Sequence, residues 1–304
     1  MRILFMGTPD IAAQSLKAII DAGHEICGVY TREDKPVGRK QILTAPPVKT
    51  LALENNIPVF QPKTLRNNDE AENIKALAPQ LIIVVAYGRI LPTEILAIPP
   101  HGCINLHVSL LPKYRGSAPI QRAVINGENE TGVTIMRLDE GVDTGDIITV
   151  APVSIDENET SGQLFEKVSD IGAKTLVNAI TLIENGTATY TKQDNASATT
   201  APPLTKEEAL FDFSADAKVL HDKIRGMNPW PMAFFMHDGK KIKAAKTLLS
   251  DKNGKAGEIL STKPLTVACE SGALVLESVI PEGKSAMDGA SWAAGRRFKT
   301  GDCI

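Results

Sequence analysis

Two polar side chains, Asn105 and His107, lie within an apolar stretch of the sequence, INLHVSLLPKYRG at residues 104–116. Side chains alternate between the two faces of a β-strand, so a strand here places both on the same face. An asparagine carboxamide donates two hydrogen bonds, and histidine exchanges a proton near neutral pH. Together they could stabilise a developing oxyanion and move a proton, although an isolated Asn-x-His pattern more often satisfies buried backbone groups.

A second polar group follows in RLDEGVDTGDII, residues 137–148, which holds four acids: Asp139, Glu140, Asp143 and Asp146. A carboxylate beside a histidine favours the imidazolium form and raises its pKa. The spacing does not say which acid would do this, and a solvated acidic turn is the alternative. A metal site built from His101, His107 and these acids matches no zinc or calcium spacing, so we expect no metal.

The elements that position these residues follow from an alternation in the first half of the chain. Short aliphatic runs alternate with helical patterns in RILFM, IAAQSLKAIIDAG, EICGVY, QLIIVVAY and GCINLHV, which is typical of an α/β fold with a mainly parallel sheet. Ligands bind outside the carboxyl ends of such strands, and the strand with Asn105 and His107 ends there. The turn MGTPDIAA lacks G-x-G-x-x-G, and the second strand ends in Tyr30-Thr31 rather than an acid. Both features argue against a nicotinamide dehydrogenase.

The remaining chain divides into a loop, a helix and a second domain. Residues 31–47, TREDKPVGRKQILTAPP, are predicted as a long functional loop with net positive charge. From residue 160, the pattern predicts one amphipathic helix with a Thr or Ser cap that ends at Asn185-Gly186. Short strands after residue 205 favour a small β-barrel. We therefore predict a catalytic domain at residues 1–190, a linker at residues 191–205 and a barrel at residues 206–304.

The composition is that of an ordinary globular protein, with 304 residues of which 43% are hydrophobic and 23% charged. No apolar run reaches the roughly 18 residues of a membrane span, and the N-terminus does not resemble a signal peptide. We expect a cytoplasmic protein with no membrane partner. Residues 1–204 hold 18 basic and 23 acidic side chains, and residues 205–304 hold 15 and 13, so any nucleic-acid binding must depend on local patches.

Four segments within residues 5–148 resemble the folate-dependent formyltransferase family: GTPDIAAQSL, VVAYGRILP, INLHVSLLPKYRGSAPIQRAVINGE and GVTIMRLDEGVDTGDII. Two later segments, RGMNPWPMAFF and PEGKSAMDGASWAAG, are similar to the second domain of the family members that act on charged initiator tRNA. The resemblance spans nearly the whole chain. It implies a Rossmann-like catalytic domain followed by a small OB-like, tRNA-binding β-barrel.

The resemblance implies that 10-formyltetrahydrofolate donates its formyl group, as a co-substrate, to the α-amino group of methionyl initiator tRNA. Asn105, His107 and Asp143 match the family's catalytic residues. Attack on the formyl group creates a tetrahedral oxyanion, for which Asn105 and a protonated His107 are suitable donors. Asp143 would keep His107 charged and carry a proton from the amine towards the leaving N10 atom. No metal is required.

The same resemblance assigns the folate site to two segments. Its residues are Ser109, Leu110, Leu111 and Pro112 in the turn after the catalytic strand, and Tyr87, Ile90 and Leu91 as walls of the pterin pocket. A plain core-strand end is an equal interpretation of the last three.

The tRNA would meet the loop at residues 31–47 through Arg39 and Lys40, and Arg115 would lie beside the acceptor end or the folate tail. An ordinary surface arginine is the alternative for Arg115. Family members commonly read G-R-G-K-K in this loop, whereas this chain reads GRKQIL, in which Gln41 and Ile42 replace two lysines. Fewer positive charges predict weaker phosphate attraction and a flatter salt dependence. Trp230 could stack on a base or act as a packing anchor.

Two other functions stay open from the sequence. Enzymes that formylate amino-sugar nucleotides share the first domain, and a noncatalytic folate- or tRNA-binding protein would share the overall design. The C-terminal barrel argues against glycinamide ribonucleotide enzymes, which lack it, and the presence of Asn105, His107 and Asp143 argues for catalysis. We expect a monomer.

Overall fold

In the computed structural model of the chain, residues 1–38, 40–66 and 68–304 are described. They form two compact units whose segments alternate along the chain. The first unit holds Met1–Gly116, Gly132–Val153 and Glu166–Thr200, and the second holds Ser117–Thr131, Ser154–Phe165 and Ala201–Ile304. The limits 1–190, 191–205 and 206–304 stay a prediction. That residues 117–131 and 154–165 pack with the C-terminal unit was not indicated by the sequence.

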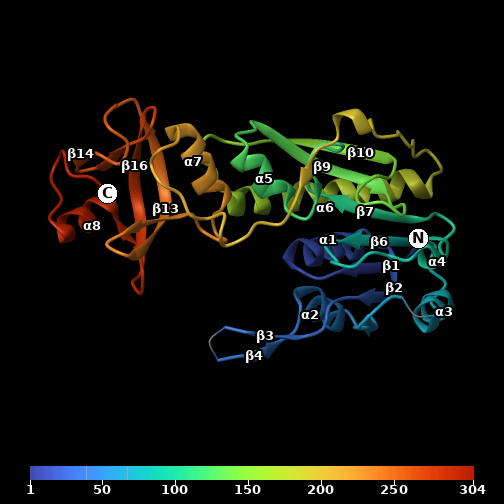
Figure 1. The fold of residues 1–304 in the computed structure, drawn as a ribbon. Helices are drawn as coiled ribbons and strands as arrows, with labels where there is room; N and C mark the ends of the chain where they lie inside the picture. The colour runs from blue at the N-terminus through green and yellow to red at the C-terminus, as the bar shows by residue number, and fades with distance from the viewer. Residues whose placement is uncertain (39, 67) are drawn as a thin grey trace. The chain divides into compact units, whose positions relative to one another are not determined.

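A seven-stranded sheet forms the centre of the first unit, in the order β10-β9-β7-β6-β1-β2-β5 (Figure 1). Parallel pairs join β1 to β2 and β6, β2 to β5, and β6 to β7, whereas β7 pairs antiparallel with β9. The strands are β1 Arg2–Gly7, β2 Glu25–Tyr30, β5 Val59–Phe60, β6 Leu81–Val85, β7 Cys103–His107, β9 Glu130–Arg137 and β10 Ile147–Ser154. The predicted mainly parallel α/β sheet is confirmed, and its strand direction changes at β7.

Helices connect and cover these strands: α1 Asp10–Asp21, α2 Pro47–Glu54, α3 Asn68–Ala76, α4 Thr93–Leu96 and α6 Ser161–Glu184. The start of α6 is a capping box, because Gln163 N donates to Thr160 Oγ1 at 3.3 Å and Thr160 N donates to Gln163 Oε1 at 2.9 Å. Gly186, with φ +67°, follows its last turn. The predicted long helix is therefore confirmed, including its Thr cap and its glycine end.

The segment predicted as a loop at residues 31–47 contains a two-stranded hairpin. Strands β3 Lys35–Val37 and β4 Ile42–Thr44 pair antiparallel, with Val37 opposite Ile42. Val37, Ile42 and Leu43 are 56%, 62% and 67% exposed. Short strands with outward apolar side chains bury no face, so the alternation that reveals a half-buried strand is missing from this segment.

The second unit contains an antiparallel sheet in the order β12-β13-β16-β15-β14, with β17 paired to β16. Its elements are α5 Pro119–Ile125, α7 Ala217–Gly226, β12 Phe234–His237, β13 Lys240–Ser250, β14 Ile259–Thr262, β15 Leu265–Ala268, β16 Ala273–Pro281, β17 Met287–Asp288 and α8 Gly289–Arg296. Edge-to-face contacts between Phe211, Phe213, Phe235 and Trp292 fill its core. The predicted β domain after the α/β domain is confirmed.

Helix α7 binds the inserted segment 154–165 to the second unit. His221 Nε2 donates to Glu157 O at 3.1 Å, and Arg225 Nη1 donates to Glu159 O at 3.0 Å. Arg225 also pairs with Asp222 at 2.8 Å inside the unit, so the buried charge is compensated. Among the described residues, no helix is long and apolar enough to cross a membrane.

Candidate active site

Strand β7 carries the two polar side chains that the sequence singled out. Asn105 lies between Val84 on β6 and Met136 on β9, and His107 lies opposite Thr134 on β9. His107 is 5% exposed, whereas Asn105 is half-buried. Within residues 1–38, 40–66 and 68–304, the Asn105 carboxamide makes no hydrogen bond to another residue. The alternative that both side chains satisfy buried backbone groups therefore describes His107, which bonds Tyr114 O, but not Asn105.

The turn after β7 is bound to the neighbouring strand by Thr134. The Thr134 hydroxyl donates to Ser109 O at 2.7 Å and accepts from Leu111 N at 3.1 Å, while Ser109 Oγ donates to Lys113 O at 2.6 Å. The turn therefore brings Tyr114 O within 3.0 Å of His107 Nε2. Because a carbonyl oxygen only accepts, Nε2 carries the proton and the other ring nitrogen, Nδ1, faces elsewhere.

Asp143 is the acid that meets the histidine. Its Oδ2 atom lies 3.5 Å from His107 Nδ1 and accepts a hydrogen bond from Gly116 N at 2.8 Å. Asp139 instead accepts from Gly141 N and Thr144 Oγ1, at 3.0 and 2.7 Å, and so shapes the turn. The sequence pattern left four acids open, and the geometry selects one.

Burial of the imidazole lowers the pKa of His107 from its ordinary value. The Asp143 carboxylate and the hydrogen bond to Tyr114 O act in the opposite direction but do not outweigh burial. The predicted effect of a neighbouring acid, which is to raise this pKa, is present as a contribution, while burial sets the net direction. Burial therefore favours the neutral imidazole, in which Nε2 donates to Tyr114 O and Nδ1 lies 3.5 Å from Asp143 Oδ2.

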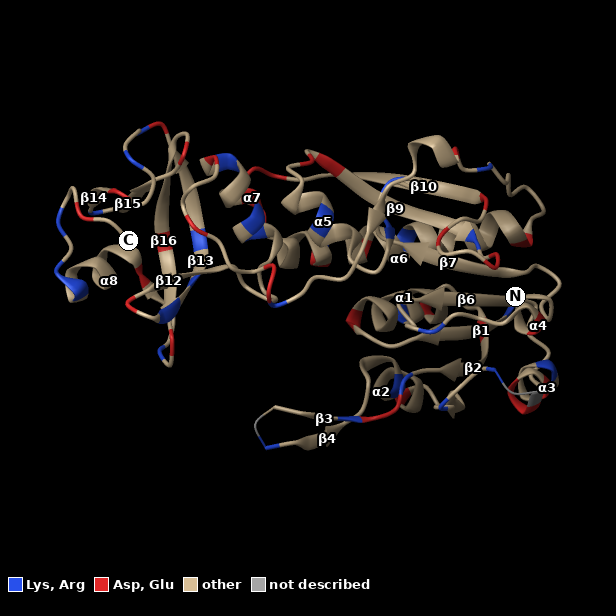
Figure 2. Cartoon of the chain, in the orientation of Figure 1, with Lys and Arg blue, Asp and Glu red and all other residues tan. Residues whose placement is uncertain are grey.

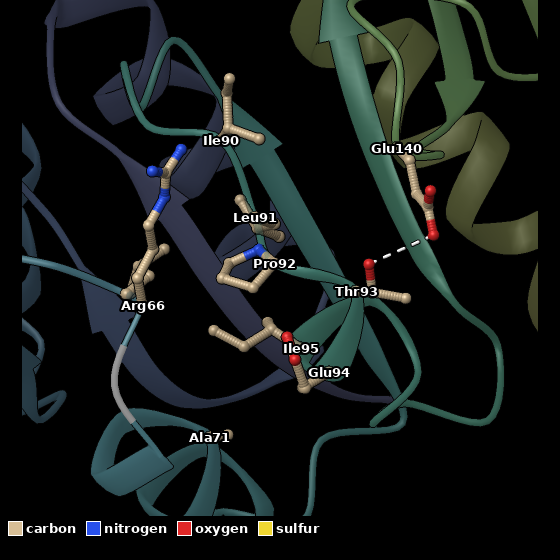
Figure 3. Close-up of a pocket in the computed structure, with 10 residues that line it drawn as sticks. Arg66, Ala71, Ile90, Leu91, Pro92, Thr93, Glu94, Ile95 and Glu140 are labelled. Carbon is tan, nitrogen blue, oxygen red and sulfur yellow. Dashed lines mark hydrogen bonds between the residues drawn. The ribbon is translucent and has the colours of Figure 1, made fainter.

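A cavity of about 350 Å³ lies in the first unit between the segment after β6 and the β9–β10 loop (Figure 3). Ile90 and Leu91 line it, and Thr93 Oγ1 donates to Glu140 Oε1 at 3.2 Å across its wall. Arg66 supplies a cation at the same cavity. Its size and its mixture of aliphatic and polar walls suit a small heterocyclic ligand.

The other predicted folate residues lie outside the lining of this cavity. Tyr87 is 1% exposed and belongs to a hydrophobic cluster with Leu4, Ile82 and Ile95, so it occupies a core position. Burial raises its pKa to about 12. Ser109, Leu110, Leu111 and Pro112 form the turn beside His107. Of the seven residues, Ile90 and Leu91 contact the cavity.

The predicted tRNA residues have different surroundings. Arg39 lies outside the described residues, and Lys40 is exposed between β3 and β4. Arg115 is half-buried and is held by three hydrogen bonds to the side chains of Gln193 and Asn195, at 2.8–3.1 Å. Figure 2 shows basic and acidic residues interspersed in both units, as the near-balanced charge counts indicate.

Sequence reasoning missed three contributors to this geometry: Gly116, Thr134 and Gln193. The sequence gives a weak indication of Thr134, because it is a polar residue within the buried part of strand β9. Gly116 acts through its backbone amide and Gln193 through its carboxamide on two backbone carbonyls, and no residue pattern indicates which backbone group a distant side chain will meet.

An α/β sheet that carries Asn105 and His107 on one strand, with Asp143 3.5 Å from His107, is combined in this chain with an antiparallel β domain. The chain belongs to the formyl transferase family. The family model described as "Formyl transferase" matches residues 1–180, and the one described as "Formyl transferase, C-terminal domain" matches residues 203–297. The family expected from the sequence motifs is confirmed.

Two relatives match over essentially their full length. A methionyl-tRNA formyltransferase of Desulforamulus reducens is 45% identical over 100% of this chain and 98% of its own, and one of Clostridioides difficile is 46% identical over 99% of both. A solved N-formyltransferase of Helicobacter canadensis, in complex with folinic acid and dTDP-3-aminofucose, has a TM-score of 0.69 at 22% identity and covers 90% of this chain and 97% of its own. The last similarity establishes the fold alone.

Proposed function

We propose that this chain transfers the formyl group of 10-formyltetrahydrofolate to the α-amino group of methionyl initiator tRNA. The observation that carries the proposal is identity of 45–46% to methionyl-tRNA formyltransferases across both the catalytic and the C-terminal domain. The solved sugar formyltransferase shares the fold at 22% identity, so it does not favour an amino-sugar acceptor. The proposal places the protein in the cytoplasm as a monomer, and it includes no metal.

Asn105 would stabilise the charge that develops on the formyl oxygen. When the amine attacks the formyl carbon, a tetrahedral adduct with an oxyanion forms, and its collapse breaks the bond to N10. Asn105 suits this task because its carboxamide is half-buried, fully available and next to His107 on β7. A preorganised donor of this kind contributes about 3–4 kcal/mol to the transition state.

His107 and Asp143 would move the proton that the attacking amine loses. The neutral imidazole accepts this proton at Nδ1, and the carboxylate 3.5 Å away stabilises the imidazolium that results. The proton then passes to N10 as it leaves, so the pair ends the reaction in its starting state. This replaces the expectation of a histidine that is already charged before the substrate binds.

The folate would occupy the cavity lined by Ile90 and Leu91, with the backbone of the turn at residues 109–112 bringing N10 to Asn105 and His107. Aliphatic side chains suit the flat faces of the pterin, and Arg66 and Glu140 offer hydrogen bonds to its edge. Tyr87 would act indirectly, by supporting the strand end from the core.

The tRNA would meet the exposed β3–β4 hairpin, where Lys40 attracts phosphate, and the second unit, where Trp230 is 53% exposed. Such exposure favours base stacking for Trp230 over a packing anchor.

Trp230→Ala is expected to raise the KM for charged tRNA by about 5–100-fold, because one base–aromatic stack contributes about 1–3 kcal/mol. The value of kcat and the melting temperature should stay near wild type, because the side chain is half in solvent. Steady-state kinetics with varied tRNA would measure this, and Trp230→Phe, which keeps a stacking face, is the matched control. A melting temperature lowered by several degrees with unchanged KM would show a packing role instead.

Transfer of radiolabelled formyl from 10-formyltetrahydrofolate tests the function directly. Charged initiator tRNA, charged elongator tRNA and an amino-sugar nucleotide serve as parallel acceptors. Labelling of the initiator tRNA alone is expected. Labelling of the sugar alone would overturn the acceptor, and labelling of none would overturn the enzymatic proposal.

A further inference from the structure

The chain after α6 returns to the active site before it enters the second unit. Thr199 O accepts from Arg115 N at 2.9 Å, and Thr199 Oγ1 accepts from Tyr114 N at 2.9 Å. The two-residue strands β8 Arg115–Gly116 and β11 Thr200–Ala201 pair at this point. Residues that read as a linker in the sequence therefore lie against the segment that carries the carbonyl partner of His107.

From this returning segment, the Gln193 carboxamide bonds Arg115, Asp143 and Gly145, and its Nε2 also contacts Met136 Sδ at 4.0 Å. Its Oε1 accepts from Arg115 Nε at 3.1 Å and from Arg115 Nη2 at 2.8 Å. Its Nε2 donates to Asp143 O at 2.9 Å and to Gly145 O at 2.8 Å. The guanidinium only donates and the carbonyl oxygens only accept, so the carboxamide has one satisfactory orientation.

The loop that Gln193 holds is conformationally demanding. Asp143 has φ +54°, in the left-handed region that L-residues other than glycine adopt at a cost. At Gly145, a Cβ atom would come within 1.7 Å of Arg137 O, so the backbone there has no room to shift towards β9. A loop of this kind needs external hydrogen bonds to keep one conformation.

Asp143 is therefore held both at its main-chain carbonyl and at its side-chain carboxylate. Gln193, oriented by Arg115, binds the main-chain carbonyl of Asp143, while the amide of Gly116, the residue after Arg115, binds its carboxylate. We infer that Gln193 is a positioning residue whose carboxamide, clamped by Arg115, keeps the Asp143 carboxylate directed at Nδ1 of His107. For its kinetic consequence this inference rests on the proposed function, but the geometry it describes does not.

Two variants and a matched control test the inference. Gln193→Ala removes the clamp, and Gln193→Glu keeps an acceptor for Arg115 but replaces the donor to both carbonyls with an oxygen. Asn195→Ala is the control, because Asn195 bonds the same guanidinium at 2.8 Å but, within the described residues, does not bond the Asp143 loop. Both Gln193 variants should lower kcat at least about 10-fold with KM values within about 2-fold, since a displaced catalytic group costs rate rather than binding.

The deciding readout is the NMR titration of the His107 ring in the ligand-free protein. Asp143 and the carbonyl of Tyr114 raise the pKa of His107 against burial. If Gln193→Ala displaces Asp143, the His107 ring should titrate at lower pH in this variant, as it should in Asp143→Asn. In Asn195→Ala, the His107 ring should titrate as in wild type. Titrations of both Gln193 variants that coincide with wild type would overturn the inference, even if melting temperatures fall. If the wild-type protein formylates no acceptor, the proposed function fails and this titration still decides the positioning role.

Discussion

Asn105→Ala is expected to lower kcat for formyl transfer by at least about 100-fold, with little change in the KM of either substrate. Removal of one preorganised oxyanion donor costs about 10²–10³ in kcat, because the lost interaction exists only in the transition state. Folding should be retained, since within the described part of the chain the Asn105 carboxamide bonds to no other residue. Steady-state kinetics and thermal unfolding of the same preparation measure both quantities.

Two further substitutions sharpen this test. Asn105→Asp keeps the size and shape of the side chain but replaces its donor with a charged acceptor, so it should lose at least as much kcat as the alanine variant. Asn185→Ala, at an exposed position after α6, is the control and should behave as wild type. If Asn105→Ala keeps kcat within a few-fold of wild type, the oxyanion role of Asn105 is wrong.

The parts of the fold that could be predicted are those where burial imposes a period on the sequence. The continuous apolar run of β6 and the long amphipathic pattern of α6 both indicate their elements, because each must bury a defined face. The same logic places Asn105 and His107 on one face of β7. By contrast, β3 and β4 bury nothing, and their hairpin left no signal.

The active site was predictable in its residue types and less so in its energetics. Sequence spacing could not choose among four acids, because the choice depends on which turn the β9–β10 loop adopts and on the amide of Gly116. It indicated the contribution of a neighbouring acid to the pKa of His107 but not the larger, opposite effect of burial. Proximity to an acid is visible in a motif, whereas the depth to which the ring is buried is a property of the packed fold.

Contacts between distant segments were the least predictable. Residues 154–165 join the second unit because α7 offers Arg225 and His221 to their carbonyls, and these bonds link positions more than 60 residues apart. Gln193 reaches the carbonyl of Asp143, 50 residues earlier. Such bonds involve backbone atoms, which every residue possesses, so the sequence carries no mark of which one is used.

His107→Ala is expected to lower kcat by about 10²–10⁴-fold, the usual contribution of a positioned proton carrier. The ratio of wild-type to His107→Ala kcat, measured from pH 5 to pH 8, reports the state of the imidazole, because the titration of the substrate's α-amino group affects both enzymes alike. Burial lowers the pKa of His107 from its ordinary value. The ratio should therefore be flat from pH 7 to pH 8 and fall as the pH drops through this lowered pKa, since protonation removes the base.

The sign of this pH dependence separates the two roles open to His107. A histidine that acts as a preformed imidazolium would give a ratio that rises on acidification, whereas a neutral base gives one that falls. Asp143→Asn adds an independent check, because loss of the carboxylate 3.5 Å from Nδ1 removes a contribution that raises the pKa, and the fall should move to still lower pH. Asp139→Asn alters an acid that bonds Gly141 and Thr144 in its own turn rather than His107, and its profile should match wild type. A ratio that rises on acidification would show that His107 acts as an imidazolium. Asp143 would then be the group that accepts the proton of the attacking amine.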